Sequence, residues 1–358
     1  MKKTFIIAEA GVNHNGSLDL ARQLIDVAAR ARADAVKFQT FRAGEVISSK
    51  APKAIYQRRT TGTEESQLEM VRKLELDENA HRSLIDHCRS RGIQFLSTPF
   101  DLKSVDLLAV TLDLPQLKLA SGEITNGPLL LKAARTGKPI ILSTGMSTLE
   151  EVETALGVLA FGYARDVEKP SLNAFASAYR SEEGRRALRK KVSLLHCTTE
   201  YPAPYDEVNL RAMETLRVTF GLPVGLSDHT TGIAVPIAAV ALGAVIIEKH
   251  FTMDHDLPGP DHRASLEPDE LDAMVAGIRQ VEAALGSPQK MPAPAEMINR
   301  DIVRRSLVAA CDIQKGDVFT EKTLAAKRPG TGISPLYYWQ WIGRHAERDY
   351  REDEIIES

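Results

Sequence analysis

The segment PIILSTG, residues 139–145, joins a short apolar run to two hydroxyl side chains. A continuous apolar run of this length is typical of a strand that is buried on both faces, as in a parallel sheet. Seven further runs of this kind are separated by stretches with the apolar periodicity of helices. The eight predicted strands are residues 5–11, 34–40, 93–100, 116–121, 139–145, 192–198, 223–229 and 244–251.

Eight successive strand–helix units predict an α/β fold, a (β/α)8 TIM barrel over residues 1–285. A doubly wound open sheet is the alternative, but no glycine-rich dinucleotide-binding turn follows the first strand. After residue 285 the chain becomes rich in proline, glycine and small polar residues, which indicates a linker over residues 286–298. The remaining residues, 299–358, contain short β-like pieces and turns and predict a small β-rich C-terminal domain.

Two connections within the predicted barrel are longer than usual. Residues 41–80 extend the connection after the second strand, and the charged residues 165–191 predict extra helices before the sixth strand. We interpret both as scaffold or dimer surface. The alternative is an active-site lid, because long βα connections often have that role.

Composition excludes several classes of protein. The chain has 358 residues, a formal net charge of −3 and no basic run, so we expect no nucleic-acid partner. Its three cysteines lie far apart, which indicates reduced thiols in a reducing compartment. The N-terminal apolar run is too short for a signal peptide, and the longest uncharged run contains Pro236 and Gly243. We therefore expect a cytoplasmic protein that does not enter the membrane.

Polar side chains collect at the C-terminal ends of the predicted strands, where the active sites of TIM barrels lie. Lys37 and Lys118 are the most informative, because each lies inside an apolar strand and burying an unpaired ammonium group is costly. Two lysines and several hydroxyl groups around one barrel mouth suit a ligand with both a phosphate and a carboxylate. The other polar residues here include Glu9, Gln39, Thr98, Ser121, Glu123, Ser143, Thr199, Tyr201 and Ser227.

His229 and His250 end adjacent predicted strands, and neighbouring strands lie about 5 Å apart. Two imidazoles at this separation could hold a divalent ion, and histidines hydrogen-bonded in the core are an equal alternative. His196 and Cys197 could suggest a thiol–imidazole pair, but sequence neighbours on a strand point to opposite faces, which favours a packed cysteine. The turn around Asp261 either is only a rigid turn or presents this carboxylate to substrate hydroxyl groups.

Ten short motifs occur at the predicted strand ends and loops, in the order found in one known family. They are AEAGVNHNG (8–16), VKFQT (36–40), STPFD (97–101), ASGE (120–123), LSTGM (142–146), HCTTEYP (196–202), LSDH (226–229), EKHF (248–251), GPDH (259–262) and KRPG (327–330). Through these motifs the chain resembles the N-acetylneuraminate (sialic acid) synthases and the related legionaminic acid synthases over essentially its whole length. The resemblance implies a catalytic TIM barrel, an antifreeze-like SAF domain and a domain-swapped homodimer.

The resemblance also implies a reaction and a set of site residues. Phosphoenolpyruvate would condense with N-acetylmannosamine or a 2,4-diacetamido-trideoxymannose and with water, giving N-acetylneuraminate or legionaminate plus phosphate. Phosphoenolpyruvate would bind Lys37, Thr98, Lys118, Ser121, Ser143, Thr199 and Ser227, and a manganese or magnesium ion would bind His229 and His250. The sugar would bind Gln39, Tyr201, Asp261 and Arg328, the last from the partner chain, and the catalytic residues would be Glu9, Glu123, Lys37 and Lys118. Thr199 departs from the asparagine of some family members, and its shorter side chain could reach phosphoenolpyruvate through water.

Two other functions fit parts of the pattern. A Schiff-base pyruvate aldolase of the sialic acid lyase type would use Lys118 or Lys37 as its nucleophile and would need no metal. A non-catalytic sugar-binding protein would fit the antifreeze-like domain. Binding alone, however, would not need both a metal-binding pair and a set of phosphate-binding residues.

Overall fold

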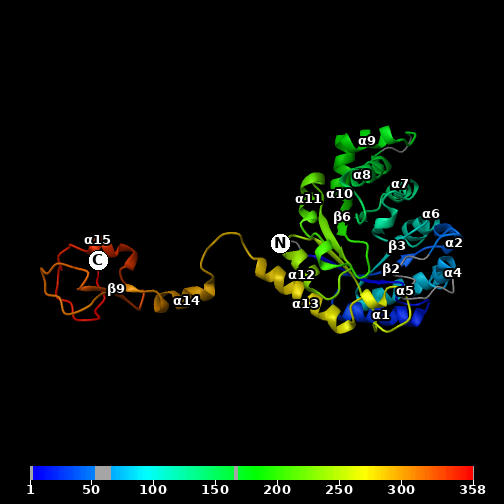
Figure 1. The fold of residues 1–358 in the computed structure, drawn as a ribbon. Helices are drawn as coiled ribbons and strands as arrows, with labels where there is room; N and C mark the ends of the chain where they lie inside the picture. Colours follow the sequence, from blue (N-terminus) through cyan, green and yellow to red (C-terminus); the bar gives the residue numbers. More distant parts are fainter. Residues whose placement is uncertain (1–2, 53–65, 165–167, 358) are drawn as a thin grey trace. The chain divides into compact units, whose positions relative to one another are not determined.

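The computed structural model describes residues 3–52, 66–164 and 168–357. The chain divides into two compact units, Met1–Gly286 and Ser287–Ser358. In the described part of the first unit, eight parallel strands form a nearly closed barrel in the order β3-β2-β1-β8-β7-β6-β5-β4, with β3 and β4 next to each other (Figure 1). This confirms the predicted strands and the TIM barrel. The strands are β1 (Phe5–Gly11), β2 (Ala35–Thr40), β3 (Gln94–Pro99), β4 (Leu117–Leu119), β5 (Ile140–Ser143), β6 (Val192–Cys197), β7 (Val224–Asp228) and β8 (Ile246–His250).

Inward-facing side chains fill the barrel in two layers of different polarity. The lower layer is an apolar cluster of Ile7, Ala35, Leu96, Ile141, Leu195 and Ile246. Because side chains alternate along a strand, the residue two positions further on faces the same side, nearer the C-terminal ends. The upper layer is therefore polar, with Glu9, Lys37, Thr98, Ser143, Cys197 and Glu248. Gly225 completes the lower layer, since a Cβ atom there would lie 2.2 Å from the Ile246 carbonyl oxygen.

Helices cover the outside of the barrel. They include α1 (Leu18–Arg30), α5 (Glu78–Arg91), α6 (Leu102–Asp106), α7 (Gly127–Arg135), α8 (Leu149–Ala164), α11 (Ala212–Phe220), α12 (Ala234–Ala241) and α13 (Pro268–Leu285). Several begin at a capping side chain that accepts a backbone N–H, for example Ser17 before α1 and Asp77 before α5. In the described ranges, no helix is long and apolar enough to cross a bilayer.

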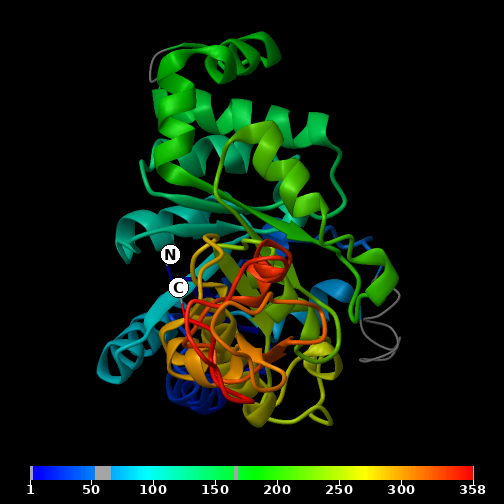
Figure 2. The ribbon, with the colours of Figure 1, turned by 90° about the vertical axis from the view of Figure 1, so that its left-hand side faces the viewer.

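The two long connections contain helices of their own. The prediction of extra helices before the sixth strand is confirmed by α9 (Leu172–Arg180) and α10 (Glu182–Lys191), which pack against α8 (Figure 2). The connection after β2 contains α2 (Ala43–Val46) and α4 (Gln67–Arg72). Residues 53–65 and 165–167 of these connections lie outside the described residues.

The second unit is small and has its own core. It contains α14 (Pro294–Val303), the antiparallel pair β9 (Ser306–Ala309) and β10 (Leu324–Lys327), and α15 (Tyr338–Trp341). Its buried apolar residues include Leu307, Phe319 and Tyr350. Helix α14 begins inside the segment that the composition indicates as a linker.

Candidate active site

A cavity of about 310 Å3 opens at the C-terminal ends of the barrel strands. It brings together nearly all the side chains that the sequence predicts for the site. The lining includes Glu9, Lys37, Gln39, Thr98, Lys118, Ser121, Ser143, Thr199, Tyr201, Ser227, His229, His250 and Asp261. Residues from every strand of the barrel, or from the loop that follows it, therefore converge on one pocket.

Four buried charged side chains, Glu9, Lys37, Lys118 and Glu248, form the floor of the pocket. Lys37 Nζ lies 2.5 Å from Glu9 Oε2 and 3.7 Å from Glu248 Oε2. Lys118 Nζ lies 3.2 Å from Glu248 Oε1. Mutual pairing allows these charges to be buried, because an unpaired charge in the interior is strongly destabilising. Glu248 has no predicted role, although strand alternation places it on the same face as His250.

The two carboxyl groups of this floor titrate very differently. Burial raises the pKa of Glu9 to about 7, although Lys37 opposes this shift. Burial also acts on Glu248, but Lys118 and Lys37 hold its pKa at about 2. Burial lowers the pKa of Lys118, despite the opposing effect of Glu248. Glu248 therefore stays ionised beside the lysines, whereas Glu9 can exchange a proton near neutral pH, as a general acid or base must.

Hydroxyl groups surround the lysines and complete an anion-binding surface. Thr98 Oγ1 accepts a hydrogen bond from Lys37 Nζ at 3.1 Å, and Ser227 Oγ donates to Glu248 Oε1 at 3.0 Å. The buried Ser143 Oγ has no hydrogen-bond partner among the described residues. Because buried hydroxyl groups are normally satisfied, Ser143 is available to an oxygen atom of a bound anion.

Gly145 allows two further hydroxyl residues to approach the pocket. Its N–H donates to Ser121 Oγ at 2.9 Å. A Cβ atom at this position would lie 2.4 Å from Thr199 Oγ1 and 2.8 Å from Ser121 Oγ. Any larger residue would therefore displace both side chains from this wall of the pocket.

His229 and His250 lie side by side, with ring centroids 5.5 Å apart. The Tyr201 ring lies 4.1 Å from the His229 ring and 5.6 Å from that of His250. Burial lowers the pKa of His250 well below its usual value, and its buried Nδ1 has no hydrogen-bond partner in the described ranges. His229 Nδ1 lies 2.7 Å from the Thr198 carbonyl oxygen, which fixes a proton there and leaves the lone pair on Nε2.

These two nitrogens are the kind of donor that a divalent ion uses. No group of three or more histidine, cysteine or acidic side chains that could hold a metal occurs among the described residues, at this site or at any other. The histidine pair thus fits an ion whose remaining ligands come from substrate or water. Metal binding at this pair stays a prediction.

Cys197 lies beside His229 and not beside its sequence neighbour. Its Sγ is 3.7 Å from His229 Nδ1, whereas His196 Nε2 hydrogen-bonds to the Val208 carbonyl oxygen at 2.6 Å. This confirms that His196 and Cys197 point to opposite faces. Burial alone would raise the pKa of Cys197, but His229 lowers it overall.

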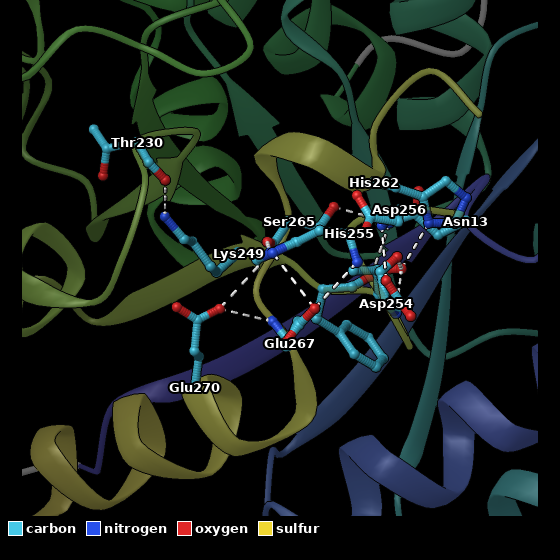
Figure 3. Close-up of polar contacts among 12 residues, drawn as sticks. Asn13, Thr230, Lys249, Asp254, His255, Asp256, His262, Ser265, Glu267 and Glu270 are labelled. Carbon is cyan, nitrogen blue, oxygen red and sulfur yellow. Dashed lines mark hydrogen bonds and ion pairs between the residues drawn. The ribbon is translucent and has the colours of Figure 1, made fainter. Parts of the chain in front are cut away.

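Asp261 lies in the loop between β8 and α13, which is held by hydrogen bonds. Figure 3 shows Asn13, His262 and Ser265 of this network. Asn13 Nδ2 donates to Ser265 Oγ at 2.9 Å, and Ser265 Oγ donates to the Asp261 carbonyl oxygen at 2.7 Å. His262 lies on the same loop, 2.6 Å from the Thr252 hydroxyl group. Burial raises the pKa of Asp261 to about 6.

One side of the pocket is apolar, and no predicted site residue belongs to it. This apolar wall consists of Val12, Phe41, Met70, Val71, Leu74 and Phe100. Three of these residues follow β1, β2 and β3 directly, and the other three lie in or just after α4. The interpretation of the long second connection as scaffold or dimer surface is therefore wrong for Met70, Val71 and Leu74, which line the pocket.

Two predicted residues are not brought into the lining. Glu123 lies in a 3-10 turn, η2 (Ser121–Glu123), where its Oε2 accepts a hydrogen bond from Asn126 Nδ2 at 2.7 Å. Arg328 belongs to the second unit, where its Nε donates to the Val303 carbonyl oxygen at 3.0 Å.

A TIM barrel with paired lysines, hydroxyl groups, a titratable carboxyl and two histidines at its C-terminal face defines an enzyme for an anionic substrate. The sequence matches the NeuB family over residues 24–290 and the SAF domain over residues 304–357. The chain therefore belongs to the NeuB family, which confirms the resemblance seen in the motifs.

Individual relatives agree with this assignment. The chain is 53% identical to the N,N'-diacetyllegionaminic acid synthase of Campylobacter jejuni, over 99% of each chain. It is 47% identical to the enzyme of the same name from Legionella pneumophila, over 92% of this chain and 87% of the relative. The crystal structure of the sialic acid synthetase of Leptospira borgpetersenii in complex with citrate matches with a TM-score of 0.68 and 33% identity, over 83% of this chain and 90% of that one.

Proposed function

We propose that this chain condenses phosphoenolpyruvate with 2,4-diacetamido-2,4,6-trideoxymannose and water, giving N,N'-diacetyllegionaminic acid and phosphate. The observation that carries the reaction class is the convergence of Lys37, Lys118, the unpaired Ser143 hydroxyl and the two histidines on one pocket. The acceptor sugar follows from the two N,N'-diacetyllegionaminic acid synthases, at 53% and 47% identity. N-acetylmannosamine is the second candidate acceptor.

The reaction needs a nucleophilic carbon, an electrophilic carbon and one water molecule. The methylene carbon of phosphoenolpyruvate attacks the open-chain aldehyde, and a carbon–carbon bond forms. Water then adds to the former enol carbon, and the bond between this carbon and the bridging oxygen breaks, so that phosphate leaves with that oxygen. The water oxygen becomes the keto oxygen of the product, and its two protons end on the new sugar hydroxyl group and on phosphate.

The floor of the pocket supplies the groups for these steps. Lys37 and Lys118 offset the charge of the phosphate and the carboxylate, and their pairing with Glu9 and Glu248 holds them in place before substrate binds. Glu9, with a pKa of about 7, takes the proton of the attacking water and returns it. Glu9 is preferred over Glu123 for this role because only Glu9 lines the pocket.

We infer that His229 and His250 hold a divalent ion, manganese or magnesium. Both histidines line the pocket together with the two lysines, and the Tyr201 ring lies 4.1 Å from the His229 ring and 5.6 Å from the His250 ring. When bound, such an ion supplies Lewis-acid polarisation of a carbonyl oxygen. Tyr201, whose ring lies 4.1 Å from the His229 ring, orients the sugar beside it.

We further infer a homodimer in which the SAF domain of one protomer serves the barrel of the other, with Arg328 donating to sugar oxygens. An exposed guanidinium with several fixed donors suits this role. The three cysteines are free, as expected for the cytoplasm, where phosphoenolpyruvate is available.

Product analysis tests the proposal. The purified protein is incubated with Mn2+, phosphoenolpyruvate and each sugar in turn, and the products are identified by mass spectrometry while phosphate release is followed. We expect the N,N'-diacetyllegionaminic acid mass and equimolar phosphate. No product with either sugar, or reduction of a pyruvate adduct onto Lys118 by borohydride, would instead support the aldolase, for which the lowered pKa of Lys118 is suited.

A further inference from the structure

The pocket divides into two sides of opposite chemistry. The charged floor and the hydroxyl groups come from all eight strands or the loops that follow them, whereas the apolar wall consists of residues that follow β1, β2 and β3 directly and of residues in or just after α4. Val12, Phe41 and Leu74 form a buried cluster against which Val71 and Phe100 pack. The rings of Phe41 and Phe100 meet edge to face, with centroids 6.3 Å apart.

We infer that the apolar wall determines which acceptor sugar is used, and that it selects the deoxygenated, doubly acetamido-substituted sugar over N-acetylmannosamine. This inference rests on the proposed function. The two sugars differ at carbons 4 and 6, where N-acetylmannosamine carries hydroxyl groups. The trideoxy sugar carries an acetamido group at carbon 4 and a methyl group at carbon 6.

The wall offers methyl, thioether and aromatic surface and no side-chain hydrogen-bond partner. A sugar hydroxyl pressed against it loses water and gains no partner, whereas a methyl group gains contact. Pockets of this kind disfavour an added hydroxyl group by up to roughly 100-fold. Met70 adds adaptability, since its unbranched thioether chain fills irregular gaps against a ligand.

The wall is held in place by contacts that do not depend on a ligand. Helix α4 begins with a capping box, in which Ser66 Oγ accepts from the Glu69 N–H and the Glu69 carboxylate accepts from the Ser66 N–H. Beyond α4, Glu75 Oε1 accepts from the Ala43 N–H at 2.7 Å. The end of α4 also lies against the loop after β1, because a Cβ atom on Gly16 would be 2.5 Å from the Lys73 carbonyl oxygen. Because these contacts fix the wall, its side chains do not rearrange to accommodate the wrong sugar. The wall can therefore discriminate between ligands.

The obvious alternative is that these residues are only a satellite hydrophobic core under a long connection. The two interpretations, a satellite core and a selectivity wall, predict different effects of a polar substitution on the turnover of the two sugars. In a satellite core, a polar side chain lowers stability and changes turnover of both sugars equally. In a selectivity wall, it changes the ratio between the two sugars.

The test compares Met70→Gln and Val71→Thr, which nearly preserve shape, with the apolar controls Met70→Leu and Val71→Ile. For each, kcat/KM is measured for both sugars at saturating phosphoenolpyruvate, and the ratio of the trideoxy sugar to N-acetylmannosamine is formed. We expect the polar variants to lower this ratio by roughly tenfold or more. The KM for phosphoenolpyruvate and the ratio in the apolar controls should stay within about twofold of wild type.

The inference is overturned if the polar variants keep the wild-type ratio, or if the apolar controls shift it equally. Melting temperatures identify any variant that fails to fold. If Met70→Gln fails to fold, the test relies on Val71→Thr, because Val71 is only half-buried. If wild-type protein turns over neither sugar, the proposed function has failed. In that case saturation-transfer NMR still tests the wall, which should saturate the carbon-6 methyl and acetamido methyl protons most strongly in wild type and less in Val71→Thr.

Discussion

Lys249→Met should destabilise the barrel more than almost any other single substitution outside the apolar core. Lys249 Nζ lies 2.6 Å from Asp228 Oδ2, and the two side chains are 0% and 1% exposed. Lys249 Nζ also donates to the Thr230 carbonyl oxygen (Figure 3). The variant leaves Asp228 buried without a counter-charge, which costs about 3–5 kcal/mol. Since each kcal/mol lowers the melting temperature of a large domain by about 2–4 °C, the barrel transition should fall by roughly 6–20 °C.

Differential scanning calorimetry at pH 7 measures this shift, with two variants as controls. Lys132→Met removes a lysine whose partner Asp106 is 55% exposed, and it should cost less than about 1 kcal/mol. Adding Asp228→Asn to Lys249→Met removes the isolated charge and should restore at least half of the loss. The reasoning is refuted if Lys249→Met melts at the same temperature as Lys132→Met, or if Asp228→Asn lowers it further.

Three further predictions concern the site. Infrared titration of the ligand-free protein should show a carboxyl group that ionises near pH 7 and is absent from Glu9→Gln. Because the pKa of Glu9 in the folded protein lies above the unfolded value of 4.5, this group stabilises the fold at low pH and loses that contribution as the pH rises through about 7. Glu9→Gln should therefore gain stability relative to wild type between about pH 5 and 8. His250→Ala should weaken Mn2+ binding, measured by electron paramagnetic resonance, by more than roughly tenfold, and an unchanged affinity would place the metal elsewhere. Mixing inactive Arg328→Ala and His229→Ala chains under subunit exchange should restore up to about a quarter of wild-type activity if the arginine acts across a symmetric dimer, and none if it serves its own barrel.

Most of the barrel could be predicted because each strand is a local pattern. A run such as residues 139–145 has apolar side chains on both faces, so its strand conformation can be predicted from its own composition. The same alternation would also have predicted Glu248, two residues before His250 on an inward-facing strand position. Alternation fails for Glu123, because β4 ends at Leu119 and the 3-10 turn that follows rotates the side chain out of the pocket.

The apolar wall could not be predicted from local pattern. Helix α4 has only six residues, too few for a clear apolar periodicity. In the sequence, Met70 and Val71 are typical of the buried face of any helix. Their position in the pocket depends on contacts between distant segments, such as that of Gly16 with the Lys73 carbonyl oxygen. Contacts of this kind are set by tertiary packing, and no signal for them exists in either segment alone.

The two layers of the barrel explain how one strand pattern provides both stability and function. The apolar lower layer and the larger core around it stabilise the fold without help from the site. The upper layer and the neighbouring Lys118 together hold two lysines and two glutamates that pair with one another, so the charges can be buried before any substrate arrives. Ser143 Oγ and His250 Nδ1 nevertheless remain without partners among the described residues, which costs stability in the ligand-free protein. Such a cost persists where a bound ligand removes it, and both residues line the pocket.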